Sequence, residues 1–140
     1  VLFRSACGGV LRYMLQYSGL GEVIGDAVSS ANLPIVVVAF VVAALVRISV
    51  GSSTVAMTMA AGIVAALPGI AELSLLYLAC TTAAVAGGAT VCSHFNDSGF
   101  WLVKSLVGMD EKTTLKTWTI METLVGVTGF IVALIISMFA

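Results

Sequence analysis

The sequence predicts an all-α polytopic membrane protein. Of its 140 residues, 60% are apolar and only 9% are charged, whereas an average soluble domain carries about 25% charge. The mean hydropathy is +1.14. Long apolar segments, each suited to a helix in lipid, are broken by two short polar stretches; the segments lie at 33–48, 55–67, 75–91 and 118–139. With a net charge of −1 and six Lys plus Arg, the chain has no basic surface for nucleic acid.

The first part of the chain is shorter and more polar than the rest. Residues 6–17 are expected to be the end of a helix, and 18–32 a loop with an amphipathic segment at the membrane surface. No cleavable signal peptide is visible. Because a polytopic carrier normally contains two structural repeats, we expect residues 1–140 to be the C-terminal part of a transporter membrane domain whose N-terminal part is missing.

Residues 33–68 are predicted to form a helical hairpin. Pro34 suits the first turn of the first helix, and Pro68 ends the second. At about 1.5 Å per residue the two helices reach roughly 24 Å and 20 Å, less than the ~30 Å of a bilayer core. A turn inside the bilayer is tolerated only where protein buries it or water reaches it. Hydropathy alone leaves a re-entrant hairpin and two short spans equally open.

Residues 73–108 are predicted to form a discontinuous helix. The polar stretch 92–99 divides it, and the apolar part that follows, 99–108, is too short to span alone. A plain loop between two spans is the alternative. Residues 104–116 are expected to be a surface loop whose three Lys indicate the cytoplasmic side. Residues 118–139 are the clearest transmembrane helix, about 33 Å long.

The first polar stretch contains candidate substrate-binding residues. A charged side chain at mid-bilayer costs about 2.5–3.5 kcal/mol, so Arg47 is expected to face a cavity and to bind a carboxylate. The alternative is a side chain that reaches the lipid headgroups. Ser52, Ser53 and Thr54 offer hydroxyls and backbone N–H groups at a helix start, which attracts anions. Simple capping of the helix is the alternative.

The second polar stretch contains candidates for hydroxyl binding and proton coupling. His94 is the only histidine of the chain, and histidine is the residue type most suited to exchange protons at physiological pH. Asp97, if buried without a partner, would favour its protonated form, so the two residues are candidates to carry a coupling proton. Ser93 and Asn96 are candidates to bind substrate hydroxyls. The alternative is a structural hydrogen-bonded pair of His94 and Asp97 that caps the broken helix.

Other chemistry is not expected. The three cysteines have neither a CxxC nor a zinc-site spacing, and no serine lies in a GxSxG context. We therefore expect no catalytic residue, no metal and no cofactor, with a proton gradient as the source of coupling ions. Glu122 is interpreted as a satisfied helix-end residue near Trp118 and Lys116, and a proton role for it is the less favoured alternative.

Three motifs, in order, resemble the gluconate permease (GntP) family of gluconate:proton symporters. They lie at 47–56, 93–102 and 115–123, and the likeness runs from about Gly8 to Ala140. The most specific part is His94-Phe95-Asn96-Asp97-Ser98-Gly99-Phe100-Trp101-Leu102. The resemblance implies a multi-pass protein of the bacterial inner membrane. It also implies one repeat of an inverted-repeat ion-transporter-like fold, and it favours the re-entrant form of the 33–68 hairpin.

The function expected from these features is proton-coupled transport of gluconate or a related small hydroxy acid. Arg47 or the helix start at Ser52–Thr54 would hold the carboxylate, and Asp97 with His94 would carry the proton. The alternatives are a carrier of another small carboxylate such as D-serine, or an accessory membrane subunit that transports nothing. Expected partners are the carboxylate substrate, the bilayer and the rest of the transporter; association into a homo-oligomer is left open.

Overall fold

The computed structural model describes Val10, Tyr13, Met14, Tyr17 and residues 33–67 and 69–140. Across these residues the secondary structure is helical and contains no strand, which confirms the all-α class. The segment predicted at 6–32 falls almost entirely outside the described residues. The helices are α3 (Ile35–Val50), α4 (Ser53–Ala65), η1 (Ile70–Glu72), α5 (Leu75–Gly88), α6 (Ser98–Val107), α7 (Glu111–Thr114), the π-helical η2 (Leu115–Thr119) and α8 (Ile120–Ser137).

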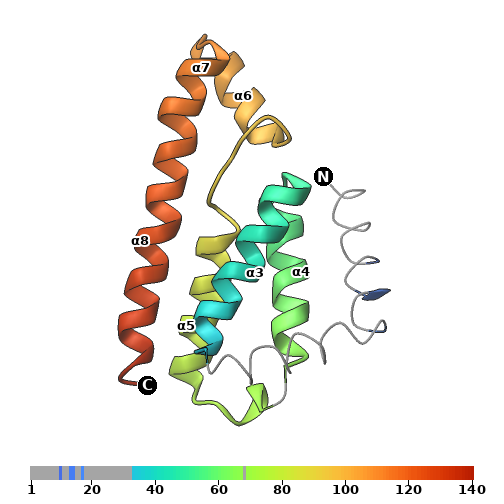
Figure 1. Cartoon of the computed structure of the whole chain (residues 1–140), viewed down its shortest axis with the longest axis vertical. Coiled ribbons are helices and arrows are strands. Elements are labelled where there is room, and N and C mark those ends of the chain that lie inside the picture. Colours follow the sequence, from blue (N-terminus) through green and yellow to red (C-terminus); the bar gives the residue numbers. More distant parts are fainter. Residues whose placement is uncertain (1–9, 11–12, 15–16, 18–32, 68) are drawn as a thin grey trace.

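Three helices pack around small side chains, and the last helix covers one side of them. α3 packs against both α4 and α5, and α5 also packs against α8 (Figure 1). Alanines dominate the buried core, which allows the helices to approach closely; its completely buried members are Val36, Ala39, Ala43, Ala56, Ala60, Ala84 and Ala89. The α6 and α7 helices lie beyond this bundle, at the end where α3 finishes (Figure 1).

Two adjacent glycines bring α5 against both neighbouring helices. A Cβ atom at Gly87 would lie 2.7 Å from the carbonyl oxygen of Gly126 in α8, and one at Gly88 would lie 2.3 Å from that of Phe40 in α3. Any larger residue would force the backbones apart. These contacts fix the distances between α3, α5 and α8, and with them the positions of the polar side chains that the three helices carry toward one end.

The last helix begins earlier than the sequence indicated. α7, η2 and α8 form one helix of 27 residues, Glu111–Ser137, whereas the expected start was Trp118. Asp110 caps it by accepting the Thr113 N–H at 3.3 Å, and hydrogen bonds with Thr113, first with its side chain and then with its backbone, lower the pKa of the Asp110 carboxyl. The charged residues that suggested a loop therefore occupy the first turns of a helix, since charge by itself does not prevent helix formation.

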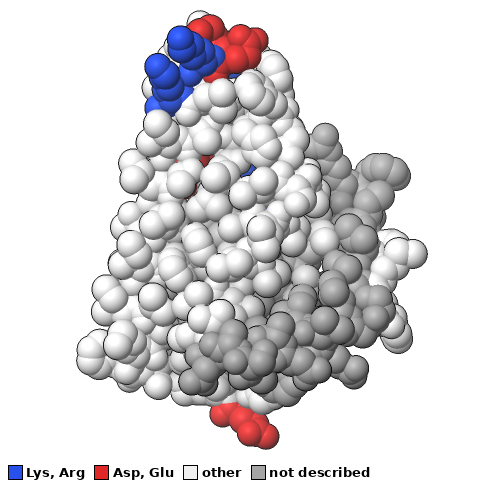
Figure 2. All heavy atoms as spheres, viewed as in Figure 1, with Lys and Arg blue, Asp and Glu red and all other residues white. Residues whose placement is uncertain are grey.

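The distribution of polarity fits a membrane protein. Among the described helices, Glu111–Ser137 is the one long and apolar enough to cross a bilayer, while α3, α4, α5 and α6 are shorter apolar helices. Figure 2 shows charged atoms gathered at the two ends of the molecule and an almost uncharged surface between them. Large apolar side chains of α8 are exposed on that surface, among them Leu124, Val125, Ile131, Val132 and Ile135.

Candidate functional site

A buried arginine joins three distant parts of the chain. Arg47 lies in the last turn of α3, and only 2% of its surface is exposed. Its Nη2 atom donates to Asp97 Oδ2 at 2.5 Å and to Glu122 Oε2 at 3.4 Å. Asp97 belongs to the irregular segment 89–97 between α5 and α6, and Glu122 to the first turn of α8. One cation therefore faces two carboxylates in an otherwise apolar bundle.

Asp97 is held by several donors at once. It is the N-cap of α6, where its Oδ1 atom accepts the Gly99 N–H at 2.9 Å. Its Oδ2 atom accepts from Arg47 and from the Ser93 hydroxyl, each at 2.5 Å. An extended backbone at Asp97 (φ −92°, ψ 126°) is usual for an N-cap residue. The carboxylate is thus positioned by local helix capping and by the tertiary contact together.

The 89–97 segment is anchored by one face of the final helix. Thr123 Oγ1 accepts the Cys92 N–H at 3.1 Å, and the Thr119 hydroxyl donates to the Ser93 carbonyl oxygen. The indole Nε1 of Trp118 donates to the Ser93 hydroxyl at 3.1 Å. Trp118 and Thr119 belong to η2, and Thr123 belongs to the start of α8, as Glu122 does. Wide π-helical turns such as η2 occur often at functional sites.

The turn between α3 and α4 lies against the same segment. The Asn96 side-chain amide donates to the Ile48 carbonyl at 2.8 Å and to the Ser49 carbonyl at 3.4 Å, which closes the end of α3. Gly51 has a left-handed backbone (φ 70°), and a Cβ atom there would lie 2.3 Å from the Asn96 carbonyl oxygen. The two polar stretches of the sequence are therefore in direct contact.

The structure places the predicted site residues in three groups. Arg47, Ser93 and Asp97 form one hydrogen-bonded cluster. The second group lies where the α3–α4 turn meets the 89–97 segment: Asn96 contacts the end of α3, the half-buried Ser52 is the N-cap of α4 without a side-chain cap hydrogen bond, and Ser53 and Thr54 begin α4. The half-buried His94 is the third, and its side chain bonds to the Cys92 carbonyl.

The side-chain partner of Asp97 is Arg47 rather than His94. His94 Nδ1–H donates to the Cys92 carbonyl at 2.8 Å, and the hydrogen bond between His94 and Asp97 is a backbone one, from the Asp97 N–H to the His94 carbonyl at 2.8 Å. The alternative of a His94–Asp97 side-chain pair is therefore not what the structure shows. Asp97 does cap the helix, but it does so through its own contact with Gly99.

Glu122 is the site residue that sequence reasoning missed. It was interpreted as a helix-end residue, because the last helix was expected to start at Trp118. The helix starts a further two turns earlier, so Glu122 lies well inside it and its side chain is 19% exposed. An acidic residue inside an apolar span is by default a functional candidate, and that signal was present in the sequence.

The guanidinium of Arg47 is only partly used. Its Nε and Nη1 atoms are buried and have no hydrogen-bond acceptor within the described part of the chain. A buried donor left without an acceptor costs about 1–3 kcal/mol, and more when charged. Such a group retains the capacity to bind another acceptor, and a carboxylate is the acceptor that a guanidinium fits best.

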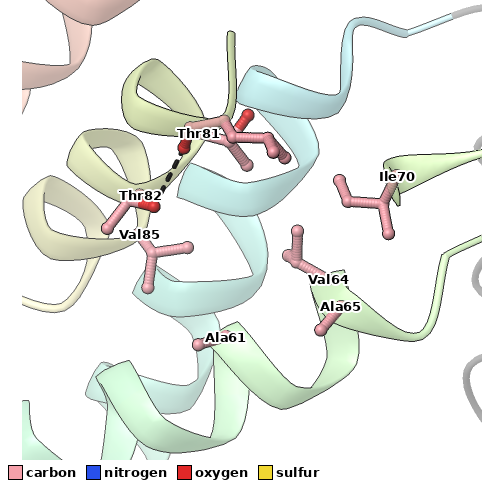
Figure 3. A pocket seen from close by; sticks show the side chains of 8 residues that line it. Ala61, Val64, Ala65, Ile70, Thr81, Thr82 and Val85 are labelled. Atoms are coloured by element: carbon pink, nitrogen blue, oxygen red, sulfur yellow. Dashed lines mark hydrogen bonds between the residues drawn. The ribbon is translucent and has the colours of Figure 1, made fainter. Parts of the chain in front are cut away.

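A separate hollow between α4 and α5 has a different character. It has a volume of about 330 Å³ and lies near the other end of α4; Figure 3 shows Ala61 and Val64 opposite Thr82 and Val85. The Thr81 and Thr82 hydroxyls donate to carbonyls of their own helix, those of Tyr77 and Leu78. The hollow is apolar and offers no charged group to a hydrophilic acid.

Known proteins similar to this chain are transporters. The family model for GntP family permeases matches residues 1–139. The chain is 44% identical over 137 residues to the "Low-affinity gluconate transporter" of Escherichia coli, with 96% of the chain and 30% of the relative covered. It is 42% identical to the "Gluconate permease" of Pseudomonas aeruginosa (94% and 29% covered) and 35% identical to the "Gnt-II system L-idonate transporter" of Escherichia coli (98% and 30% covered).

The chain spans about 30% of the length of these curated relatives. No solved structure matches it. The family match over nearly the whole chain and the named relatives agree with the buried polar cluster in an apolar helical bundle. The chain therefore belongs to the GntP family of permeases and is a membrane protein of a transport family.

Proposed function

We propose that this chain is part of a proton-coupled carrier of gluconate or a related small hydroxy acid. The polypeptide of this carrier crosses the bacterial inner membrane several times. The relatives named for gluconate and for L-idonate support the substrate class. The observation that carries the proposal is Arg47, buried in an apolar bundle, with two nitrogen atoms that have no acceptor among the residues that the structure describes. An accessory subunit would need Arg47 only to hold helices together, and Nη2 alone makes those contacts.

The substrate site is proposed at the contact between the two polar stretches. Gluconate has one carboxylate and several hydroxyl groups. Arg47 supplies a cation for the carboxylate, and the N-terminus of α4 with Ser52, Ser53 and Thr54 supplies hydrogen-bond partners nearby in the chain. Ser93 and Asn96 shape the site, because their side chains hold Asp97 and the end of α3 in place.

The arrangement of the short helices supports a site within the membrane. α3 and α4, with 16 and 13 residues, reach only about 24 Å and 20 Å. We propose that they form a re-entrant hairpin and that α5 and α6 form a discontinuous helix, as one repeat of an inverted-repeat fold. Irregular backbone is tolerated at membrane depth where protein buries it, and the 89–97 segment is bonded to the last helix.

The coupling proton is proposed to bind in the same region. The sequence predicts Asp97 and His94 as carriers of the coupling proton. Asp97 belongs to the cluster in which two carboxylates face one cation. Two nearby carboxylates seldom both stay ionised beside a single positive charge in an apolar environment. One acidic group of this cluster is therefore suited to take up and release a proton.

The test is uptake of labelled gluconate by a transport-deficient bacterium that expresses the whole protein to which this chain belongs. Wild-type uptake should collapse when a protonophore is added. Arg47→Lys keeps the positive charge but replaces the planar, bidentate guanidinium by a compact ammonium, and it should lower uptake at least about tenfold. Lys104→Arg, at an exposed ion pair with Glu111, is the control. Equal uptake by Arg47→Lys and wild type, at equal amounts in the membrane, would refute the assignment of Arg47.

A further inference from the structure

We propose that Glu122 is the carboxylate that carries the coupling proton, and that its protonation releases Arg47 to bind the substrate carboxylate. This inference rests on the proposed function and names the acidic group that performs it. The two acids at Arg47 differ in how tightly they are held. Asp97 accepts from Arg47 and Ser93 at 2.5 Å and from Gly99 at 2.9 Å, whereas the contact of Glu122 with Arg47 Nη2 is longer, at 3.4 Å.

Accessibility also separates the two acids. The side chain of Glu122 is 19% exposed and that of Asp97 is 9% exposed. Asp97 is further fixed because it caps α6, so its movement would disturb a helix end. Glu122 lies inside a continuous helix and caps no helix end, so its side-chain contacts are not part of a helix terminus. The more exposed and less restrained acid is the better exchanger, and Asp97 is the better permanent partner of Arg47.

Among the described residues, Arg47 is the one cation paired with Glu122. Of the elements packed against α8, α3 carries Arg47 as its one charged residue, and the 89–97 segment carries Asp97, with Cys92 and His94 as further titratable groups. α5 contains only Tyr77 and Cys80 as titratable residues, both far from its Gly87 contact with α8. Lys116 lies earlier on the same helix and is exposed. Arg47 is therefore the cation that Glu122 faces, in addition to Asp97.

The exchange follows from charge balance. While Glu122 is ionised, Arg47 faces two carboxylates and a third anion would be repelled. A proton taken up by Glu122 neutralises it and weakens its contact with Nη2. The substrate carboxylate then replaces that negative charge beside Arg47, where Nε and Nη1 have no acceptor in the described part of the chain. On the other side of the membrane, loss of the proton restores the Glu122 carboxylate, which competes with the substrate and favours its release.

The experiment separates coupling from binding. Membrane vesicles containing the whole protein are assayed for gluconate accumulation driven by an imposed pH gradient, and for counterflow of labelled against unlabelled gluconate without a gradient. Glu122→Gln, nearly isosteric, should lose accumulation at least about tenfold and keep counterflow within about twofold. Glu122→Asp should recover part of the accumulation. Asp97→Asn should lose both activities, because Arg47 is no longer held.

Two further readings make the test specific. In wild type, the apparent affinity for gluconate should fall by up to about tenfold per pH unit once Glu122 is ionised, and Glu122→Gln should remove this dependence. Glu111→Gln is the matched control, since Glu111 and Glu122 are the two acids of the last helix and Glu111 pairs with Lys104 at the surface.

The inference is overturned if Glu122→Gln accumulates gluconate as wild type does. It is also overturned if Glu122→Gln and Glu122→Asp both lose counterflow while they reach the membrane in normal amounts, since Glu122 would then be structural. If the wild type itself shows no protonophore-sensitive uptake, the proposed function fails, and the role of Glu122 fails with it.

Discussion

A methyl group added at Gly126 should push the last helix away from α5. A Cβ atom there would lie 2.5 Å from the Gly87 carbonyl oxygen and 2.8 Å from Val91 Cγ1. Carbon–oxygen contacts begin at about 3.3 Å, so α8 would have to retreat by roughly 0.8 Å. Overpacking of this kind costs about 1–3 kcal/mol. The opposing gain in helix propensity from Gly to Ala is about 0.8–1.0 kcal/mol.

Gly129→Ala provides a control in the same helix. Nothing lies within 4 Å of a Cβ atom at Gly129, so the substitution brings the gain in propensity without a steric cost. The difference between the two variants therefore isolates the contact with Gly87. Thermal unfolding of the purified whole protein in detergent should show Gly126→Ala melting below wild type and Gly129→Ala at or above it. Equal melting temperatures for the two variants would show that the close approach of α5 and α8 does not contribute to stability.

Two further predictions concern the loops. Gly51→Ala should reduce gluconate uptake much more than Gly108→Ala. Both glycines have a left-handed backbone, but a Cβ atom at Gly51 would lie 2.3 Å from the Asn96 carbonyl oxygen, whereas one at Gly108 would have nothing within 4 Å. Similar losses of uptake in the two variants would contradict a packing role for Gly51. Asp110→Ala removes the oxygen that accepts the Thr113 N–H and should weaken amide protection at Thr113 in hydrogen exchange. Since the Asp110 pKa is lowered from 3.8, the cap contributes stability above that pH and loses it as the pH falls through the lowered value, so the difference from wild type should shrink in acid.

Much of this architecture could be predicted from local sequence patterns. The apolar segments at 33–48 and 75–91 correspond to α3 and α5. Pro34 lies directly before the first residue of α3, Ile35. The predicted start of the last helix at 118 is too late, because the charges of 104–116 favour a surface loop whereas the helix begins at Glu111. A capping Asp110 followed by Glu111 is also typical of a helix start, so the information was present in the residues themselves.

The partners of the buried charges could not be predicted in the same way. Hydropathy shows that Arg47, Asp97 and Glu122 are costly in an apolar environment, but it does not show which of them meet. Asp97 and Glu122 lie 50 and 75 residues from Arg47 along the chain. Their contact with Arg47 depends on the rotation and spacing of α3, α5 and α8. Those are set by the close approaches at Gly87, Gly88 and Gly126.

Composition and motif order were thus sufficient to establish the helical membrane class and the GntP family, because both depend on residue type and local spacing. The assignment of Asp97 to Arg47 instead of His94, and the entry of Glu122 into the site, came only with the tertiary structure. Side chains far apart in sequence are brought within hydrogen-bond distance by helix packing, and packing depends on the three-dimensional fit of backbones that no local pattern contains.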